Sequence, residues 1–208
     1  MSQYYYLVAS LPLLAYEDRE AADPAEFLET LEDHLSEAEL DEVRRARIDA
    51  PLAEESWSSE AIAADVLGAA YSVPARPILA AWEAFERGVR NALVRLRTAT
   101  RGGDPAQFIR LDAAGHEDSD AVEIADAARE AFNHDSPLSG EDILNRARWS
   151  RLEDLEAGHY FDLDRIIVYY LKLQILARRR LFAHDRGEEA FTRITDTIIN
   201  DYYQEQSE

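Results

Sequence analysis

The 208-residue sequence contains no cysteine and a single lysine, Lys172. The absence of cysteine excludes disulfide bonds, thiolate zinc sites, iron–sulfur clusters and cysteine nucleophiles. No apolar run is long enough to cross a bilayer, and the run over residues 166–171 ends at Lys172. Residues 4–16 are uncharged, but they lack the basic start of a signal peptide. We therefore expect a cytoplasmic protein without direct membrane insertion.

Motifs of common enzyme classes are also absent from the sequence. It contains no phosphate-binding GxxxxGK[ST], no dinucleotide-binding GxGxxG and no GxSxG nucleophile motif. The sequence has 42 acidic residues, so pairs of carboxylates at helical spacing are unavoidable. Such pairs are more typical of a solvated helix face than of an acid–base site. We predict a protein that is not an enzyme, with no catalytic residues, no cofactor and no bound metal.

The charge balance restricts the partners. The formal net charge is −20, from 42 acidic and 22 basic residues. A surface that binds nucleic acid or anionic lipid needs clustered cations, so neither is an expected partner. The composition, 47% hydrophobic and 31% charged, is that of a globular protein.

Capping signals and apolar residues at helical spacing dominate the chain. They predict helices within residues 24–35, 36–48, 59–67, 78–101, 120–132, 139–157, 162–180 and 191–202. The clearest is the helix over 78–101, which has an apolar stripe containing Trp82. Its other face is predicted to hold two exposed ion pairs, Glu83–Arg87 and Glu86–Arg90.

These patterns predict an all-α fold, a helical bundle of two loosely similar modules. The modules span residues 1–113 and 114–208, with a single packed domain as the alternative. The segment from Tyr4 to Ala9 has strand-like composition, so one short N-terminal strand is a further expectation. Its one candidate partner is the segment from Phe108 to Leu111.

Two pairs of residues have a partial likeness to metal sites. Glu156 and His159 have the Glu-x-x-His spacing of di-iron bundles, which need a second such motif that this sequence lacks. The pair His184-Asp185 is like the metal dyad of HD-type phosphohydrolases, without the other ligands. A metal-dependent hydrolase or di-iron enzyme that uses these residues is therefore one hypothesis for function, and two others follow below.

Two clusters are candidates for a partner interface. Tyr4, Tyr5 and Tyr6 form an aromatic run, which either contacts a partner or packs onto the body of the protein. The basic cluster of Arg178, Arg179 and Arg180 either binds an acidic partner or balances nearby carboxylates and the helix end.

Three segments resemble proteins of rotary ATPases. The opening residues Tyr4 to Pro12 (YYYLVASLP) resemble the start of a small bacterial family whose genes lie among those of V/A-type ATPases. The block from Tyr169 to Leu176, followed by Arg178-Arg179-Arg180 and Gly187, resembles a helix of the C (d) subunit of these ATPases. The segment Arg90 to Leu93, with Arg97 and Gly102, is similar to an earlier helix of the same subunit.

This resemblance implies a non-catalytic central-stalk or accessory subunit that links the soluble shaft to the membrane rotor ring. Its partners would be other ATPase subunits, and it would be peripheral to the membrane through that complex. Two departures are visible: the chain has room for about two of the subunit's three modules, and Gln174 replaces an expected acidic residue. The alternative is a helical adaptor or regulator with an unrelated protein partner.

Overall fold

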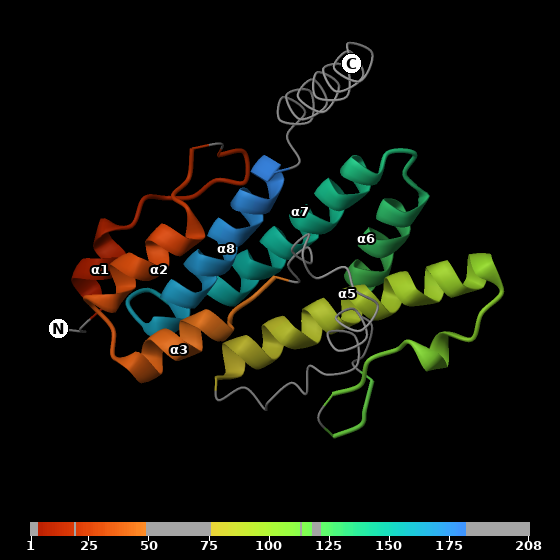
Figure 1. The fold of residues 1–208 in the computed structure, drawn as a ribbon, viewed down its shortest axis with the longest axis horizontal. Helices are drawn as coiled ribbons and strands as arrows, with labels where there is room; N and C mark the ends of the chain where they lie inside the picture. Colours follow the sequence, from red (N-terminus) through yellow and green to blue (C-terminus); the bar gives the residue numbers. More distant parts are fainter. Residues whose placement is uncertain (1–3, 19, 49–75, 113, 118–121, 182–208) are drawn as a thin grey trace, which may run out of the picture.

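The computed structural model describes residues 4–18, 20–48, 76–112, 114–117 and 122–181 (Figure 1). Within these residues the regular secondary structure is entirely helical, which confirms the all-α prediction. The helices predicted over 59–67 and 191–202 lie outside the described residues, as do His184 and Asp185.

Three short helices open the chain: α1 (Tyr5–Ser10), α2 (Pro24–Glu32) and α3 (Glu37–Arg45). Asp23 caps α2, and Pro24 occupies its first position, where a missing N–H costs nothing. Ser36 and Glu39 form the reciprocal capping box predicted for α3.

The expectation of a short strand over Tyr4–Ala9 is wrong, because this segment lies in α1. A strand needs a partner for its backbone groups, whereas a helix satisfies them internally. The proposed partner segment, Phe108–Leu111, follows a 3-10 helix, η2 (Pro105–Gln107), and is irregular. Leu7 anchors α1 by packing into the core.

Four longer helices complete the described part of the chain: α5 (Pro77–Arg101), α6 (Val122–Asn133), α7 (Pro137–Glu156) and α8 (Leu163–Leu181). The α5 helix ends as predicted at Gly102, whose φ of 75° favours glycine. The α7 helix begins two residues before the predicted position 139, because Ser136 is its N-cap and Pro137 follows. Gly140 lets α7 approach α6 closely, since an added Cβ would lie 2.7 Å from the Ala131 carbonyl oxygen.

The α8 helix is the centre of the fold. It lies between α7 on one side and α2 and α3 on the other (Figure 1). Most of its residues from Leu163 to Leu176 are buried, including those on several sides of the helix. This confirms the prediction that neighbours surround its apolar central part.

Two hydrophobic clusters form the interior. The larger joins α1, α2, α3 and α8 to the first half of α5 and the second half of α7. The smaller lies between the second half of α5, α6 and the first half of α7. It consists of Val89, Ala92, Ile124, Ala128 and Leu144. Both clusters contain residues from either side of position 113. The division into two modules and its single-domain alternative both stay predictions.

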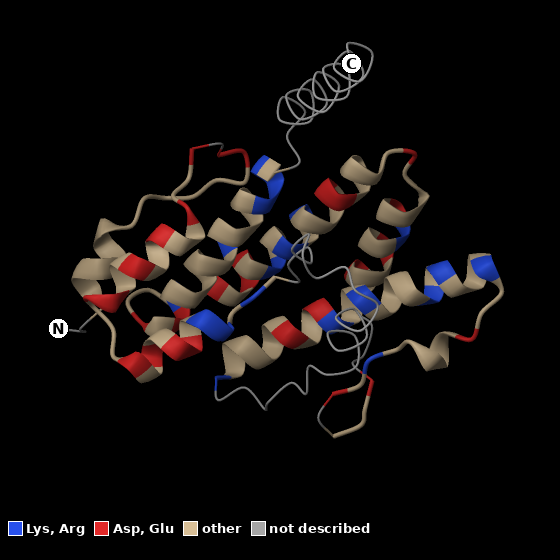
Figure 2. Ribbon diagram, in the orientation of Figure 1, with Lys and Arg blue, Asp and Glu red and all other residues tan. Residues whose placement is uncertain are grey.

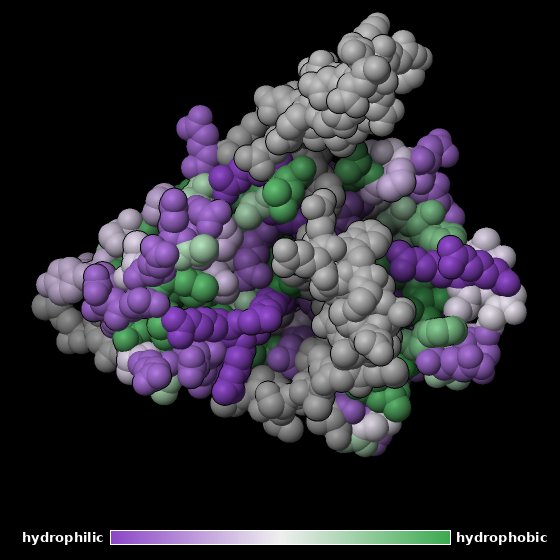
Figure 3. Space-filling model, in the orientation of Figure 1, coloured by the Kyte–Doolittle hydropathy of each residue, from purple (hydrophilic) through white to green (hydrophobic). Residues whose placement is uncertain are grey.

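Hydrophilic side chains cover much of the described surface on one face of the molecule (Figure 3). On the face drawn in Figure 3, hydrophobic side chains of the described residues lie in separate small groups. None of the described helices combines the length and the apolar character that a membrane span requires.

Candidate functional site

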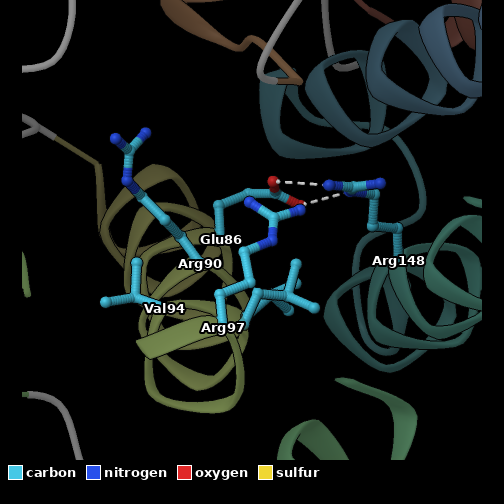
Figure 4. A pocket seen from close by; sticks show the side chains of 7 residues that line it. Glu86, Arg90, Val94, Arg97 and Arg148 are labelled. Atoms are coloured by element: carbon cyan, nitrogen blue, oxygen red, sulfur yellow. Dashed lines mark hydrogen bonds and ion pairs between the residues drawn. The ribbon is translucent and has the colours of Figure 1, made fainter. Parts of the chain in front are cut away.

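A buried ion pair joins α5 to α7 at the boundary between the two hydrophobic clusters. The Arg148 guanidinium donates to both carboxylate oxygens of Glu86, with Nε–Oε1 and Nη2–Oε2 distances of 2.8 and 3.3 Å (Figure 4). Glu86 is 8% exposed and Arg148 6%. This overturns the prediction of an exposed Glu86 that pairs along its own helix, and Arg87 is buried as well.

A cavity of about 270 Å³ lies beside this ion pair (Figure 4). Its wall combines apolar and charged side chains of α5 with one arginine of α7: Glu86, Val89, Arg90, Leu93, Val94, Arg97 and Arg148. In Figure 4, Arg148 extends across from α7, whereas Arg90 points away from the ion pair. Arg90 and Arg148 therefore do not converge on one point.

The Arg148 side chain continues this network to α8. Its Nη1 donates to Glu141 Oε1 at 3.1 Å and to Asn145 Oδ1 at 3.0 Å. Glu141 Oε1 also lies 3.0 Å from Nη2 of Arg178. A chain of alternating charges therefore ties α5, α7 and α8 together, and Arg178 is its member on α8.

Arg179 belongs to a second network, centred on Tyr16. The guanidinium groups of Arg179 and Arg146 both contact the Tyr16 ring, with their carbons 3.9 and 4.5 Å from its centroid. Its hydroxyl donates to Asp142 Oδ1 at 2.8 Å, and Arg179 donates to the same oxygen and to the Tyr16 carbonyl. The N-terminal segment is thereby fixed to α7 and α8.

The surroundings of Tyr16 shift two titrating groups in opposite directions. Burial, together with the hydrogen bond to Asp142, raises the pKa of the Tyr16 hydroxyl. Burial tends to raise the pKa of the Asp142 carboxyl, but the bonds from Tyr16 and Arg146 outweigh it and lower that pKa. Asp142 is therefore held as the anion that both arginines need.

The predicted basic cluster lies at the end of α8, and its three side chains contact different partners. Arg178 and Arg179 bind carboxylates of α7, whereas Arg180 donates over 3.4 Å to the Ala22 carbonyl. The role of all three arginines at a partner interface stays a prediction. Because two of them hold the bundle together, reversing their charges would test folding as well as binding.

The three predicted tyrosines differ in their surroundings. The Tyr4 hydroxyl donates to Glu39, which ties α1 to α3. Tyr5 is partly exposed, and its ring contacts Phe161 in the turn between α7 and α8. Tyr6 is 74% exposed. Sequence reasoning missed Phe161 and its neighbour Tyr160, although two adjacent aromatics between Gly158 and Asp162 are an unusual turn sequence.

The one group of potential metal ligands in the described residues lies at the start of α8. Nδ1 of His159 is 2.7 Å from Asp162 Oδ2 and 3.7 Å from Asp164 Oδ2. Both carboxylates already have partners: Asp162 accepts the backbone N–H of Arg165, and Asp164 binds Arg76. Helix capping and ion pairing account for this arrangement. His159 is thus near two aspartates, whereas Glu156, its expected co-ligand, binds Lys172 and Arg165.

Lys172 is buried on α8, beside the Trp149 ring and bound to Glu156. Burial lowers its pKa to about 8, although the Glu153 carboxylate opposes that shift. The unfolded chain keeps this proton up to about pH 10.5, so it binds more protons than the folded chain above about pH 8. Stability should therefore rise with pH in this range.

We expect the free energy of unfolding to rise by at most about 1.4 kcal/mol per pH unit between about pH 8 and pH 10. Above that range buried Tyr169 and Tyr170, whose pKa values burial raises, reverse the trend. Urea unfolding across the range should show the rise in the wild type and not in Lys172→Met. Equal pH slopes in both proteins would contradict the assignment.

Gln174, the residue that replaces an expected acidic side chain, has a structural role. Its side-chain N–H donates to the Ala46 carbonyl at 2.8 Å, and its oxygen accepts the Ile48 N–H at 3.1 Å. A carboxylate could accept but not donate, so the amide is the group that satisfies both backbone partners. Gln174 therefore holds the segment after α3 against α8.

The fold and these networks define an all-α bundle whose interior polar groups fix helices to one another. Comparison with protein families matches residues 53–202 to the family described as "Protein of unknown function (DUF2764)". The match covers more than half of the chain, which therefore belongs to that family. Comparisons with curated proteins and with solved structures give no match.

Proposed function

We propose that this protein is a non-catalytic subunit or accessory subunit of a V/A-type rotary ATPase, where it links the soluble shaft to the membrane rotor ring. The proposal starts from the resemblance of residues 4–12 and 169–180 to proteins of that complex. A part that transmits force between other subunits needs a rigid body rather than a reactive site.

The observation that supports the proposal is the position of these two segments. Residues 169–180 lie in α8, the helix with the most neighbours in the described bundle. Residues 4–12 contain α1, and its Leu7 packs in the same hydrophobic cluster as Tyr169 and Leu173. Two segments far apart in sequence thus share one core.

The internal ties also favour a rigid body. Charged or hydrogen-bonded side chains connect α8 to α7, to the N-terminal segment and to the end of α3 through Arg178, Arg179 and Gln174. Partly buried side-chain networks of this kind favour one arrangement of the helices. A bundle tied in this way would resist relative motion of its helices under load.

Deletion of the gene in the native host tests the proposal. We expect membranes of the deletion strain to lose ATP-driven ion transport, while the released catalytic part still hydrolyses ATP. The wild-type gene should restore transport. Unchanged coupling between hydrolysis and transport in the deletion strain would contradict the proposal.

A point substitution gives a sharper version of this test. Arg180→Glu should leave the bundle folded, because Arg180 lacks the carboxylate contacts of Arg178 and Arg179 in the described residues. If the basic cluster contacts a partner, this variant restores less transport than wild type. Arg129→Glu on α6 is the matched control, because Arg129 is exposed and, within the part of the chain that the structure describes, pairs with its near neighbour Asp126.

A further inference from the structure

An exposed aromatic patch lies where α1 meets the turn between α7 and α8 (Figure 1). It consists of Tyr5, Tyr6, Tyr160 and Phe161. The Tyr5 ring centroid lies 4.8 Å from that of Phe161 and 5.6 Å from that of Tyr6. Tyr6 and Tyr160 are 74% and 72% exposed, and the other two are 42% exposed.

Contacts of the neighbouring residues hold the aromatic patch in place. Leu7 anchors α1 in the core, and the bond between Tyr4 and Glu39 fixes the start of α1 to α3. Asp162 caps α8 directly after Phe161. A surface that is already ordered loses little conformational entropy on binding, and rigid aromatic side chains are common at the energetic centres of interfaces.

Acidic groups surround the aromatic patch. Glu39 lies beside Tyr4, and Asp162 and Asp164 follow Phe161 at the start of α8. Two basic side chains of the described residues contact this group: Arg76 is shared between Asp164 and Glu42, and the His159 ring lies beside Asp162 and Asp164. Acidic side chains also predominate over α2 and the start of α3, whereas arginines gather at the far end of α5 (Figure 2). The local potential therefore favours a basic partner.

We propose that the aromatic patch is a docking surface for another protein whose contacting segment presents arginine or lysine beside apolar side chains. The cation would stack on a tyrosine ring and face the neighbouring carboxylates, a combination that is stronger when desolvated. The chain already uses this contact internally, where Arg146 and Arg179 stack on Tyr16. Nucleic acid and anionic lipid would be repelled. This inference does not depend on which complex contains the partner.

Site-specific photo-crosslinking in the native host tests the inference. Tyr6 is replaced by p-benzoylphenylalanine, the cells are irradiated, and the crosslinked peptides are identified by mass spectrometry. Val122 at the start of α6 is the matched control, because it is also 74% exposed but lies away from the aromatic patch. We expect position 6, and not position 122, to capture one segment of another protein that contains arginine or lysine.

The identity of the captured segment decides the outcome. An acidic or uncharged segment, a second copy of this chain, or no capture would overturn the inference. A basic segment from a protein outside the rotary ATPase would support the inference and contradict the proposed function. An ATPase subunit captured through an acidic segment would overturn the inference and support the proposed function.

The captured partner then allows a binding measurement with purified proteins. We expect Tyr6→Ala to weaken the complex about tenfold or more, and Val122→Ala to leave its Kd unchanged. Unfolding of both variants in urea confirms that they are folded. Equal affinity of the two variants would also overturn the inference.

Discussion

Replacing Arg148 with methionine is expected to lower the free energy of unfolding by about 3–5 kcal/mol. Methionine fills a similar volume but removes the guanidinium, so the Glu86 carboxylate stays buried at the α5–α7 contact without this partner. An uncompensated buried charge costs far more than the ion pair contributes. Urea unfolding should show a lower midpoint with an unchanged m value.

The double variant Glu86→Leu/Arg148→Met separates this cause from a general packing defect. Removing both charges leaves an apolar contact of similar volume, which is often neutral or stabilising. We expect the double variant to recover most of the stability lost in Arg148→Met. A double variant no more stable than the single one would contradict the role assigned to the ion pair.

Truncation of Trp82 to alanine should cost about 3–5 kcal/mol. Trp82 is 1% exposed, and its ring stacks on Phe85 at a centroid distance of 5.7 Å. Its indole N–H donates to the Arg47 carbonyl at 3.0 Å, so the substitution leaves both a cavity and an unsatisfied oxygen. Urea unfolding measures the loss.

Phe108→Ala is the control for Trp82, because Phe108 is more than half exposed. That substitution should change the free energy of unfolding by less than about 0.5 kcal/mol. A loss in Trp82→Ala as small as that would mean that α5 does not pack into the core through this residue.

The two largest expected effects both involve a buried residue of α5, Trp82 in one case and Glu86 in the other, but only the burial of Trp82 was foreseeable. Trp82 belongs to a stripe with helical spacing, and that local pattern predicts a buried face. Glu86 has Arg90 one turn away, so local reasoning predicts an exposed pair on the opposite face. Its partner Arg148 is 62 residues distant, and only the packing of α7 against α5 shows that Glu86 is buried.

Helix ends were similarly predictable where the signal is local. Ser36 with Glu39, and Gly102, define their helix ends through contacts within one turn. The strand predicted from Tyr4 to Ala9 was wrong, because the aromatic and apolar composition of this segment suits either a strand or a short helix. The described residues contain no strand that could pair with it, so the helix is formed. The arginines after Ala177 were correctly placed at the end of α8, but their pairing with Glu141 and Asp142 depends on tertiary packing.

The same limit applies to the candidate interface. Tyr5 and Tyr6 were identified because adjacent tyrosines are visible in sequence. Tyr160 and Phe161 lie more than 150 residues away, and only the docking of α1 beside the α7–α8 turn brings them together. The sequence could therefore indicate half of the aromatic patch and none of its acidic surroundings.

The composition of the complex isolated from the native host tests the central claim most directly. The chain is tagged, purified under mild conditions, and its partners are identified and quantified by mass spectrometry. We predict recovery of rotor-ring and shaft subunits of a V/A-type ATPase at a fixed ratio to the tagged chain. Recovery of the chain alone, or with an unrelated partner and no ATPase subunit, would contradict the account.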